Sequence, residues 1–147
     1  MSRLVASFFG VGFFPKAPGT AGSAVALLLG AGLMSGPSWL LPFGAALAAV
    51  TGYLAIPHAV TDPQADPGWV VIDEVAGQWI ALLGLGGVSM IGLAAAFVGF
   101  RLLDIWKPGP VGWADRQTGA FGIMADDILA GGGVALLLYA ARHVVAF

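Results

Sequence analysis

Two adjacent acids stand inside an apolar stretch, and this feature most restricts what the chain can form. Asp73 and Glu74 follow Val70-Val71-Ile72 and precede a run that reaches Trp79-Ile80. An ionised carboxylate taken out of water costs several kcal/mol unless it is paired with a cation or bound to a metal. The rest of the chain must therefore supply a partner for these two side chains.

The same pattern recurs twice downstream. Arg101, Asp104 and Lys107 lie in or directly after an apolar run, and Asp126-Asp127 interrupt another. Any one of these acids can be explained as a helix-terminal residue that binds free backbone N–H groups. Three such groups in one short chain favour a different interpretation, in which they form one composite polar site.

The composition is that of an integral membrane protein. Hydrophobic residues make up 59% of the chain and charged residues 10%, whereas a soluble domain has roughly 25% charged residues. The net charge of -2 and the lack of a basic run exclude a nucleic-acid partner. Cysteine is absent, which removes disulfides, thiolate nucleophiles and cysteine-bound metals, and leaves carboxylate oxygens as the main metal ligands.

Five apolar segments, separated by Gly, Pro and polar residues, predict an all-α, polytopic membrane helix bundle that forms a single domain over residues 1–147. Thr20 or Ser23 is expected to cap the first segment, and Asp126-Asp127 to begin the fifth. The third segment is the shortest and need not cross the membrane fully. The predicted segments cover about residues 19–34, 39–56, 70–85, 88–106 and 126–145.

The distribution of charge predicts the orientation of this bundle. With five crossings and a cytoplasmic N-terminus, five of the six basic residues face the cytoplasm and Arg142 faces the other side, as the positive-inside rule favours. The same arrangement puts all eight acids at the cytoplasmic end. Four or five carboxylates that converge there would repel one another unless a cation bound, and a site made only of oxygen ligands suits Mg²⁺.

Two groups of residues are candidates for binding an anionic substrate. Lys16, Thr20 and Ser23 lie with two glycines just before a predicted helix, where they can bind phosphate oxygens, although glycines that only permit helix packing explain the pattern about as well. Arg101 and Lys107 can form a cationic rim around the anion. The alternative for these two cations is an ion-pair set with Asp104 at a helix end.

Taken together, these motifs resemble the phosphatidylglycerophosphatase A family, in order and at comparable spacing over nearly the whole chain. The resemblance implies a small, Mg²⁺-dependent enzyme of the bacterial inner membrane. Such an enzyme removes the terminal phosphate from phosphatidylglycerophosphate and gives phosphatidylglycerol, a step of glycerophospholipid biosynthesis. The motifs that carry the resemblance are residues 18–23, 72–80, 100–108 and 122–127.

We therefore predict a phosphomonoesterase at the cytoplasmic membrane face. The predicted metal ligands are Glu74, Asp104, Asp126 and Asp127. Asp73 is predicted to be either a further ligand or the general base. Substrate binding is assigned to five residues: Lys16, Thr20, Ser23, Arg101 and Lys107.

Since the chain lacks Cys, an Asp-x-Asp motif and a suitable histidine pair, direct attack by a metal-activated water is the leading mechanism, and an aspartyl-phosphate route stays open. Asp73, Glu74, Asp104 and Asp127 are the predicted catalytic acids. The rival function is a small ion-coupled transporter or channel subunit, because intramembrane acids also mark ion paths. The sequence leaves the oligomeric state open.

Overall fold

The apolar segments form helices. The computed structural model describes residues 1–62 and 65–144, and within these ranges it contains α-helices, one 3₁₀ turn and no β-strand. The predicted all-α fold is thereby confirmed. In chain order the elements are α1 (Ser2–Ala6), the 3₁₀ turn η1 (Val11–Phe13), α2 (Pro18–Met34), α3 (Leu40–Ala59), α4 (Ile72–Leu82), α5 (Met90–Trp106), α6 (Pro110–Asp115) and α7 (Gly119–Ala141).

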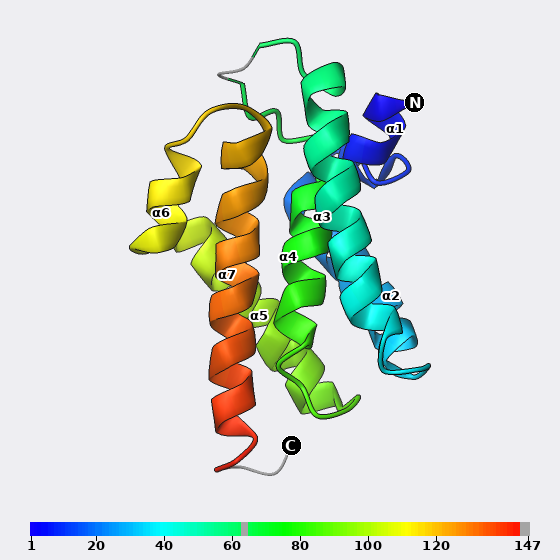
Figure 1. Cartoon of the computed structure of the whole chain (residues 1–147), viewed down its shortest axis with the longest axis vertical. Coiled ribbons are helices and arrows are strands. Elements are labelled where there is room, and N and C mark those ends of the chain that lie inside the picture. The colour runs from blue at the N-terminus through cyan, green and yellow to red at the C-terminus, as the bar shows by residue number, and fades with distance from the viewer. Residues whose placement is uncertain (63–64, 145–147) are drawn as a thin grey trace.

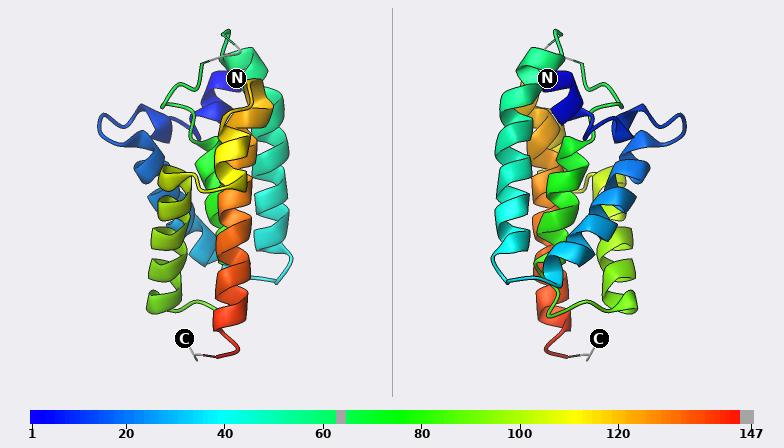
Figure 2. Two further views of the ribbon diagram at one scale, coloured as in Figure 1. Left: turned by 90° about the vertical axis from the view of Figure 1, so that its left-hand side faces the viewer. Right: turned by 90° about the vertical axis from the view of Figure 1, so that its right-hand side faces the viewer.

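The short helix α4 is the centre of the bundle. It packs against α2, α3, α5 and α7, and Figures 1 and 2 show it between α3 and α7 on one side and α2 and α5 on the other. Eight of its eleven residues are buried, among them Val75, Ala76 and Leu82. The Trp79 indole N–H donates to the carbonyl of Ala26 at 2.7 Å and ties α4 to α2. A helix of eleven residues extends only about 16 Å, so α4 cannot cross a bilayer core by itself.

Glycine lets α4 and α7 approach until their backbones touch. A Cβ built on Gly131 would overlap the carbonyl oxygen of Gly77, and one built on Gly77 would lie 2.6 Å from the carbonyl oxygen of Asp127. Small residues permit such close helix pairs, which are common in membrane bundles. This close contact places Asp127 directly against the first turn of α4.

The connections gather at two ends of the bundle. Figure 1 shows the N-terminus, the α3–α4 connection and the α6–α7 connection at one end, and the α2–α3 and α4–α5 turns at the other. The end that holds the N-terminus is called the polar end below, because the acids cluster toward it. At this end the backbone N–H of Val71 donates to the carbonyl of Ala6 at 2.9 Å, so α1 holds the residue that begins α4.

Several predicted boundaries are wrong in detail. The fifth segment begins at Gly119 rather than Asp126, so Asp126 and Asp127 lie two turns inside α7. Pro57 does not end the second segment, because α3 continues through it to Ala59. The predicted polar connection between the fourth and fifth segments contains the short helix α6. The predicted end of the fifth segment at Val145 lies outside the described residues.

Among the described residues two helices, α3 and α7, are long and apolar enough to cross a membrane, and α2 is a slightly shorter apolar helix. Large hydrophobic side chains such as Leu28, Val50 and Leu136 are exposed on the outer surface of the bundle. Apolar surface of this extent is suited to lipid rather than to water. The two candidate spans and this apolar surface fit a helical membrane protein.

Candidate active site

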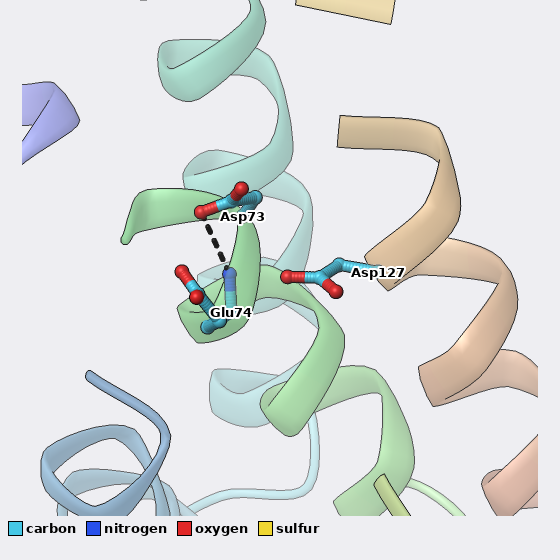
Figure 3. A group of neighbouring side chains, drawn as sticks. All are labelled: Asp73, Glu74 and Asp127. Carbon is cyan, nitrogen blue, oxygen red and sulfur yellow. Dashed lines mark hydrogen bonds between the residues drawn. The ribbon is translucent and has the colours of Figure 1, made fainter. Parts of the chain in front are cut away.

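Three carboxylates from α4 and α7 meet near the polar end of the bundle. Asp73 and Glu74 lie in the first turn of α4, and Figure 3 shows the Asp127 carboxylate pointing toward them from α7. One oxygen of each acid lies within 4.8 Å of an oxygen of the other two. Asp73 and Asp127 are buried, and the Glu74 backbone N–H donates to Asp73 Oδ1 at 3.0 Å.

A second group of three carboxylates shares one member with the first. Asp104 from α5 and Asp126 and Asp127 from α7 also offer oxygens that lie within 4.8 Å of one another. Asp127 belongs to both groups and is 2% exposed. Five acids that are separated by as many as 54 positions in sequence thus form one site, as the apolar surroundings of each acid predicted.

Two cations lie against this cluster of acids. Arg101 forms an ion pair with Asp104 on the same face of α5, one turn apart. The ammonium of Lys107 bridges two acids, Asp126 at 2.7 Å and Asp115. The predicted ion pair between Arg101 and Asp104 therefore exists, and Lys107 lies against the acids of α7 as well.

The backbone conformation at Lys107 directs its side chain toward Asp115 and Asp126. Lys107 ends α5 in the left-handed conformation, with φ of 49°, because Pro108 follows and cannot continue the helix. Partial burial opposes the charge on this side chain, but its hydrogen bonds to Asp115 and Asp126 raise the pKa of Lys107 above its ordinary value. Lys107 is therefore a permanent cation at physiological pH.

Several buried polar atoms of the site have no hydrogen-bond partner in the part of the chain that the structure describes. They are Glu74 Oε2, Asp127 Oδ1, Arg101 Nε and both amide atoms of Gln78, which lies one turn after Glu74. A buried polar group that lacks a partner costs about 1–3 kcal/mol, and more when it is charged. These atoms are therefore available to bind water, a metal ion or a substrate.

The unpartnered carboxylate oxygens fit a divalent cation. Mg²⁺ binds oxygens at about 2.1 Å, so two ligands on opposite sides of the ion are about 4.2 Å apart. Oxygens that already lie within 4.8 Å of one another need only a small movement to reach this geometry. Each group can thus supply three protein ligands, and water or a phosphate oxygen can supply the rest.

The N-terminus of α2 forms another wall of the site. A Cβ built on Gly19 would overlap Glu74 Oε1 and lie 3.5 Å from an Arg101 nitrogen. Among the residues predicted nearby, the Ser23 hydroxyl is buried and donates to the carbonyl of Gly19 at 2.9 Å. Lys16 and Thr20 are exposed and line a groove between η1 and α2. Neither of the predicted caps, Thr20 or Ser23, caps α2, whose N-cap is Ala17.

Sequence reasoning missed two residues of the site, Gly19 and Asp115. Gly19 was one of several glycines before a helix, and no pattern distinguishes the one that faces a carboxylate. Asp115 could have been found as the acid nearest after Lys107, but the short helix α6 that brings it back was not predicted.

Substituting alanine for Gly19 should displace the Glu74 carboxylate and slow the reaction while the fold is kept. A misplacement of about 1 Å at a reacting centre can reduce a rate by about 10²-fold. The measurement is the rate of phosphate release together with the melting temperature. Gly32→Ala is the matched control on the same helix, because a Cβ there meets no atom within 4 Å. Equal rates for the two variants would contradict the placement of Glu74.

The fold and the site together define a class. The chain is an all-helical bundle with two candidate membrane spans, in which one polar site combines carboxylates that can hold a divalent cation with cations that can bind an anionic group. Comparison with known proteins narrows this class.

The sequence model of the family described as phosphatidylglycerophosphatase A matches residues 4–142. The phosphatidylglycerophosphatase A of Escherichia coli is 40% identical over 143 residues, which are 96% of this chain and 83% of that protein. Its counterpart in Haemophilus influenzae is 35% identical over 96% of this chain and 88% of its own length. A Bacteroides thetaiotaomicron protein with the provisional description phosphatidylinositol-3-phosphatase is 36% identical over 97% and 94%. No solved structure matches.

The chain belongs to the phosphatidylglycerophosphatase A family. The resemblance that the motifs carried is thereby confirmed, and so is the predicted enzyme class, a lipid phosphatase of phospholipid metabolism. Its substrate is a lipid. The rival prediction of an ion-coupled transporter finds no support in these relatives.

Proposed function

We propose that this enzyme hydrolyses phosphatidylglycerophosphate to phosphatidylglycerol and phosphate with Mg²⁺ held by Glu74, Asp104, Asp126 and Asp127. The observation that carries the proposal is the convergence of these carboxylates on Asp127, beside Arg101 and Lys107. The carboxylates bind the positively charged metal ion, and Arg101 and Lys107 bind the negatively charged phosphate. Each charged component of the reaction thus has a partner of opposite charge. When bound, Mg²⁺ would neutralise phosphate charge and make a water molecule more acidic.

The remaining chemistry is assigned to side chains of this chain. Asp73 accepts the proton of the attacking water, since it lies beside Glu74 and Asp127 and the second carboxylate group supplies three metal ligands without it. Arg101 and Lys107 bind phosphate oxygens, and exposed Lys16 and Thr20 can contact the arriving head group. The Ser23 hydroxyl already donates within α2, so its predicted contact with substrate would require that hydrogen bond to break.

Direct attack by water predicts that no phosphorylated protein accumulates. Trapping a phosphorylated aspartate after brief exposure to labelled substrate would replace this mechanism by the aspartyl-phosphate route. The proposed hydrolysis would survive that result, because both routes give the same products.

The function is tested by phosphate release from purified protein in detergent micelles. The expected result is release from phosphatidylglycerophosphate with Mg²⁺, and none after chelation. Phosphatidylinositol 3-phosphate is the comparison substrate, because the Bacteroides relative carries that description. Release from this lipid alone would contradict the proposed substrate, and release that does not depend on Mg²⁺ would contradict the metal assignment.

We also propose that the five apolar helices α2, α3, α4, α5 and α7 lie in the bacterial inner membrane with the polar end toward the cytoplasm. The alternation of the connections between the two ends supports this arrangement (Figure 1). The basic residues near the polar end support the direction. Since α4 is too short to span by itself, it is held within the bundle by its four neighbours.

Single cysteines introduced into this cysteine-free chain test the topology. Thiols at Gly68→Cys and Thr118→Cys should react with a membrane-impermeant maleimide only after the inner membrane is permeabilised, because both positions are exposed at the polar end. A thiol at Gly87→Cys, in the exposed α4–α5 turn, should react from the periplasm. The reverse pattern would overturn the orientation.

A further inference from the structure

An apolar groove runs along the bundle, and three of its lining residues are chain neighbours of residues in the candidate active site. Its volume is about 900 Å³, and no charged residue is among those that line it. Its walls come from α4, α5, the α5–α6 connection and α7, with Ile80, Leu103, Pro108, Gly132, Leu136 and Tyr139 as representative members. It lies apart from every acid and cation of the site, so the proposed hydrolysis does not itself use it.

The lining of the groove adjoins the polar site along the chain. Leu103 precedes Asp104, Pro108 follows Lys107, and Ile128 follows Asp127, and all three apolar residues line the groove. Consecutive Cα atoms are about 3.8 Å apart, so the backbone of the groove lining adjoins that of the site on α5 and α7, and a ligand whose phosphate is bound at the site can extend an acyl chain toward the groove.

The length of the groove matches the depth of one membrane leaflet. Along α7 its lining extends from Ile128 to Tyr139, which is about 16 Å of helix. Half of the roughly 30 Å hydrocarbon core is about 15 Å. An acyl chain that extends from a head group at the membrane surface covers this same depth.

A missing side chain on α7 opens the groove. A Cβ built on Gly132 meets no atom within 4 Å, and its backbone is ordinary helix. Glycine inside a helix costs roughly 1 kcal/mol relative to alanine. Helix packing requires glycine at Gly131, one position earlier, but not at Gly132. The effect of glycine at position 132 is therefore to leave the space in the groove unfilled by a side chain.

We propose that this groove binds one acyl chain of the lipid substrate and so fixes the head group at the acids. The inference rests on the proposed function, because it assumes a diacyl phospholipid monoester as substrate. Burial of apolar surface contributes about 25 cal/mol per Å², so a chain seated in the groove would add substantially to affinity. The enzyme would accordingly discriminate substrates by acyl length as well as by head group.

The test fills the groove at its open position. Gly132→Phe places a ring into the space, and Gly32→Phe is the matched control, a helical glycine of α2 that is also open but lines no part of the groove. We expect Gly132→Phe to raise KM for long-chain phosphatidylglycerophosphate by about tenfold or more. KM for a short-chain analogue with the same head group should stay within about twofold, as should both values for Gly32→Phe.

A second measurement on the unchanged protein keeps the inference testable if Gly132→Phe does not fold. Phosphatidylglycerophosphate that carries a photoactivatable diazirine on its acyl chain should label peptides within residues 128–139, and excess unlabelled lipid should compete. Equal KM shifts for long and short chains, or labelling confined to other helices, would overturn the groove proposal. If wild-type protein releases no phosphate from either lipid, the proposed function fails instead.

Discussion

Replacing Asp127 with asparagine is expected to reduce phosphate release by about 10³-fold, equivalent to about 4 kcal/mol of transition-state stabilisation. Asp127 is the one acid that both carboxylate groups share, so its loss weakens both at once. Asparagine keeps the shape and one oxygen but not the charge that a divalent cation requires. The measurement is kcat/KM for phosphatidylglycerophosphate at saturating Mg²⁺.

The same variant should fold at least as stably as the wild type when no metal is present. Removing one negative charge from beside Asp73, Glu74, Asp104 and Asp126 relieves repulsion. Binding to the native state raises the melting temperature, so Mg²⁺ should stabilise the wild type and stabilise Asp127→Asn much less. Gly32→Ala, at an open position of α2, is the control and should keep both activity and the Mg²⁺ effect. Normal turnover in Asp127→Asn would remove Asp127 from the site.

Much of the fold follows from one-dimensional patterns. The helices α2 to α5 occupy the predicted segments because apolar runs must become helices in lipid, and because Gly and Pro between them prevent continuation. The site was predicted by the same energetics, since acids in apolar runs need partners. Asp73 and Glu74 lie in the first turn of α4, as expected.

The position of Asp126 and Asp127 could not be predicted in this way. Acids are favoured in the first turn of a helix, so a doublet after a polar connection resembled a helix start. In the structure Asp126 pairs with Lys107 from outside its helix, and Asp127 lies where α4 packs closely against α7. Such tertiary partners override local preference, and sequence spacing alone does not reveal them.

The contacts of Gly19 and Lys107 also could not be predicted from the sequence, because they depend on how distant segments pack together. Gly19 belongs to the site because α2 passes close to Glu74, and this depends on the packing of four helices at once. Lys107 reaches Asp115 because a left-handed residue and Pro108 turn the chain into α6. Backbone reversals of this kind are only weakly encoded in residue type here, because four of the seven described residues with positive φ are not glycine.

The structure bears on both interpretations of Arg101, as the ion-pair partner of Asp104 and as a residue that binds the substrate phosphate. One guanidinium nitrogen, Nη1, pairs with Asp104, as the structural interpretation requires. Nε is buried and has no hydrogen-bond partner among the described residues. A guanidinium that uses only Nη1 in an ion pair can still donate from its other nitrogens to a phosphate oxygen. The ion pair with Asp104 can therefore orient Arg101 for substrate without using all of its donors.

Arg101→Lys is therefore expected to lower the rate by about 10²–10³-fold, although the positive charge is kept. Lysine can still neutralise Asp104, but it cannot reproduce the planar set of donors that binds two phosphate oxygens. Arg101→Ala should be at least as slow, and it also leaves Asp104 without its cation, so the lysine variant is the cleaner test. Mg²⁺ affinity should change little in either variant, since Arg101 is not a ligand. Arg116→Lys, at an exposed arginine after α6, should behave like the wild type. If Arg101→Lys keeps near-normal turnover, or if it loses activity only in proportion to a loss of folded protein, Arg101 serves Asp104 alone and the phosphate contact belongs to Lys107.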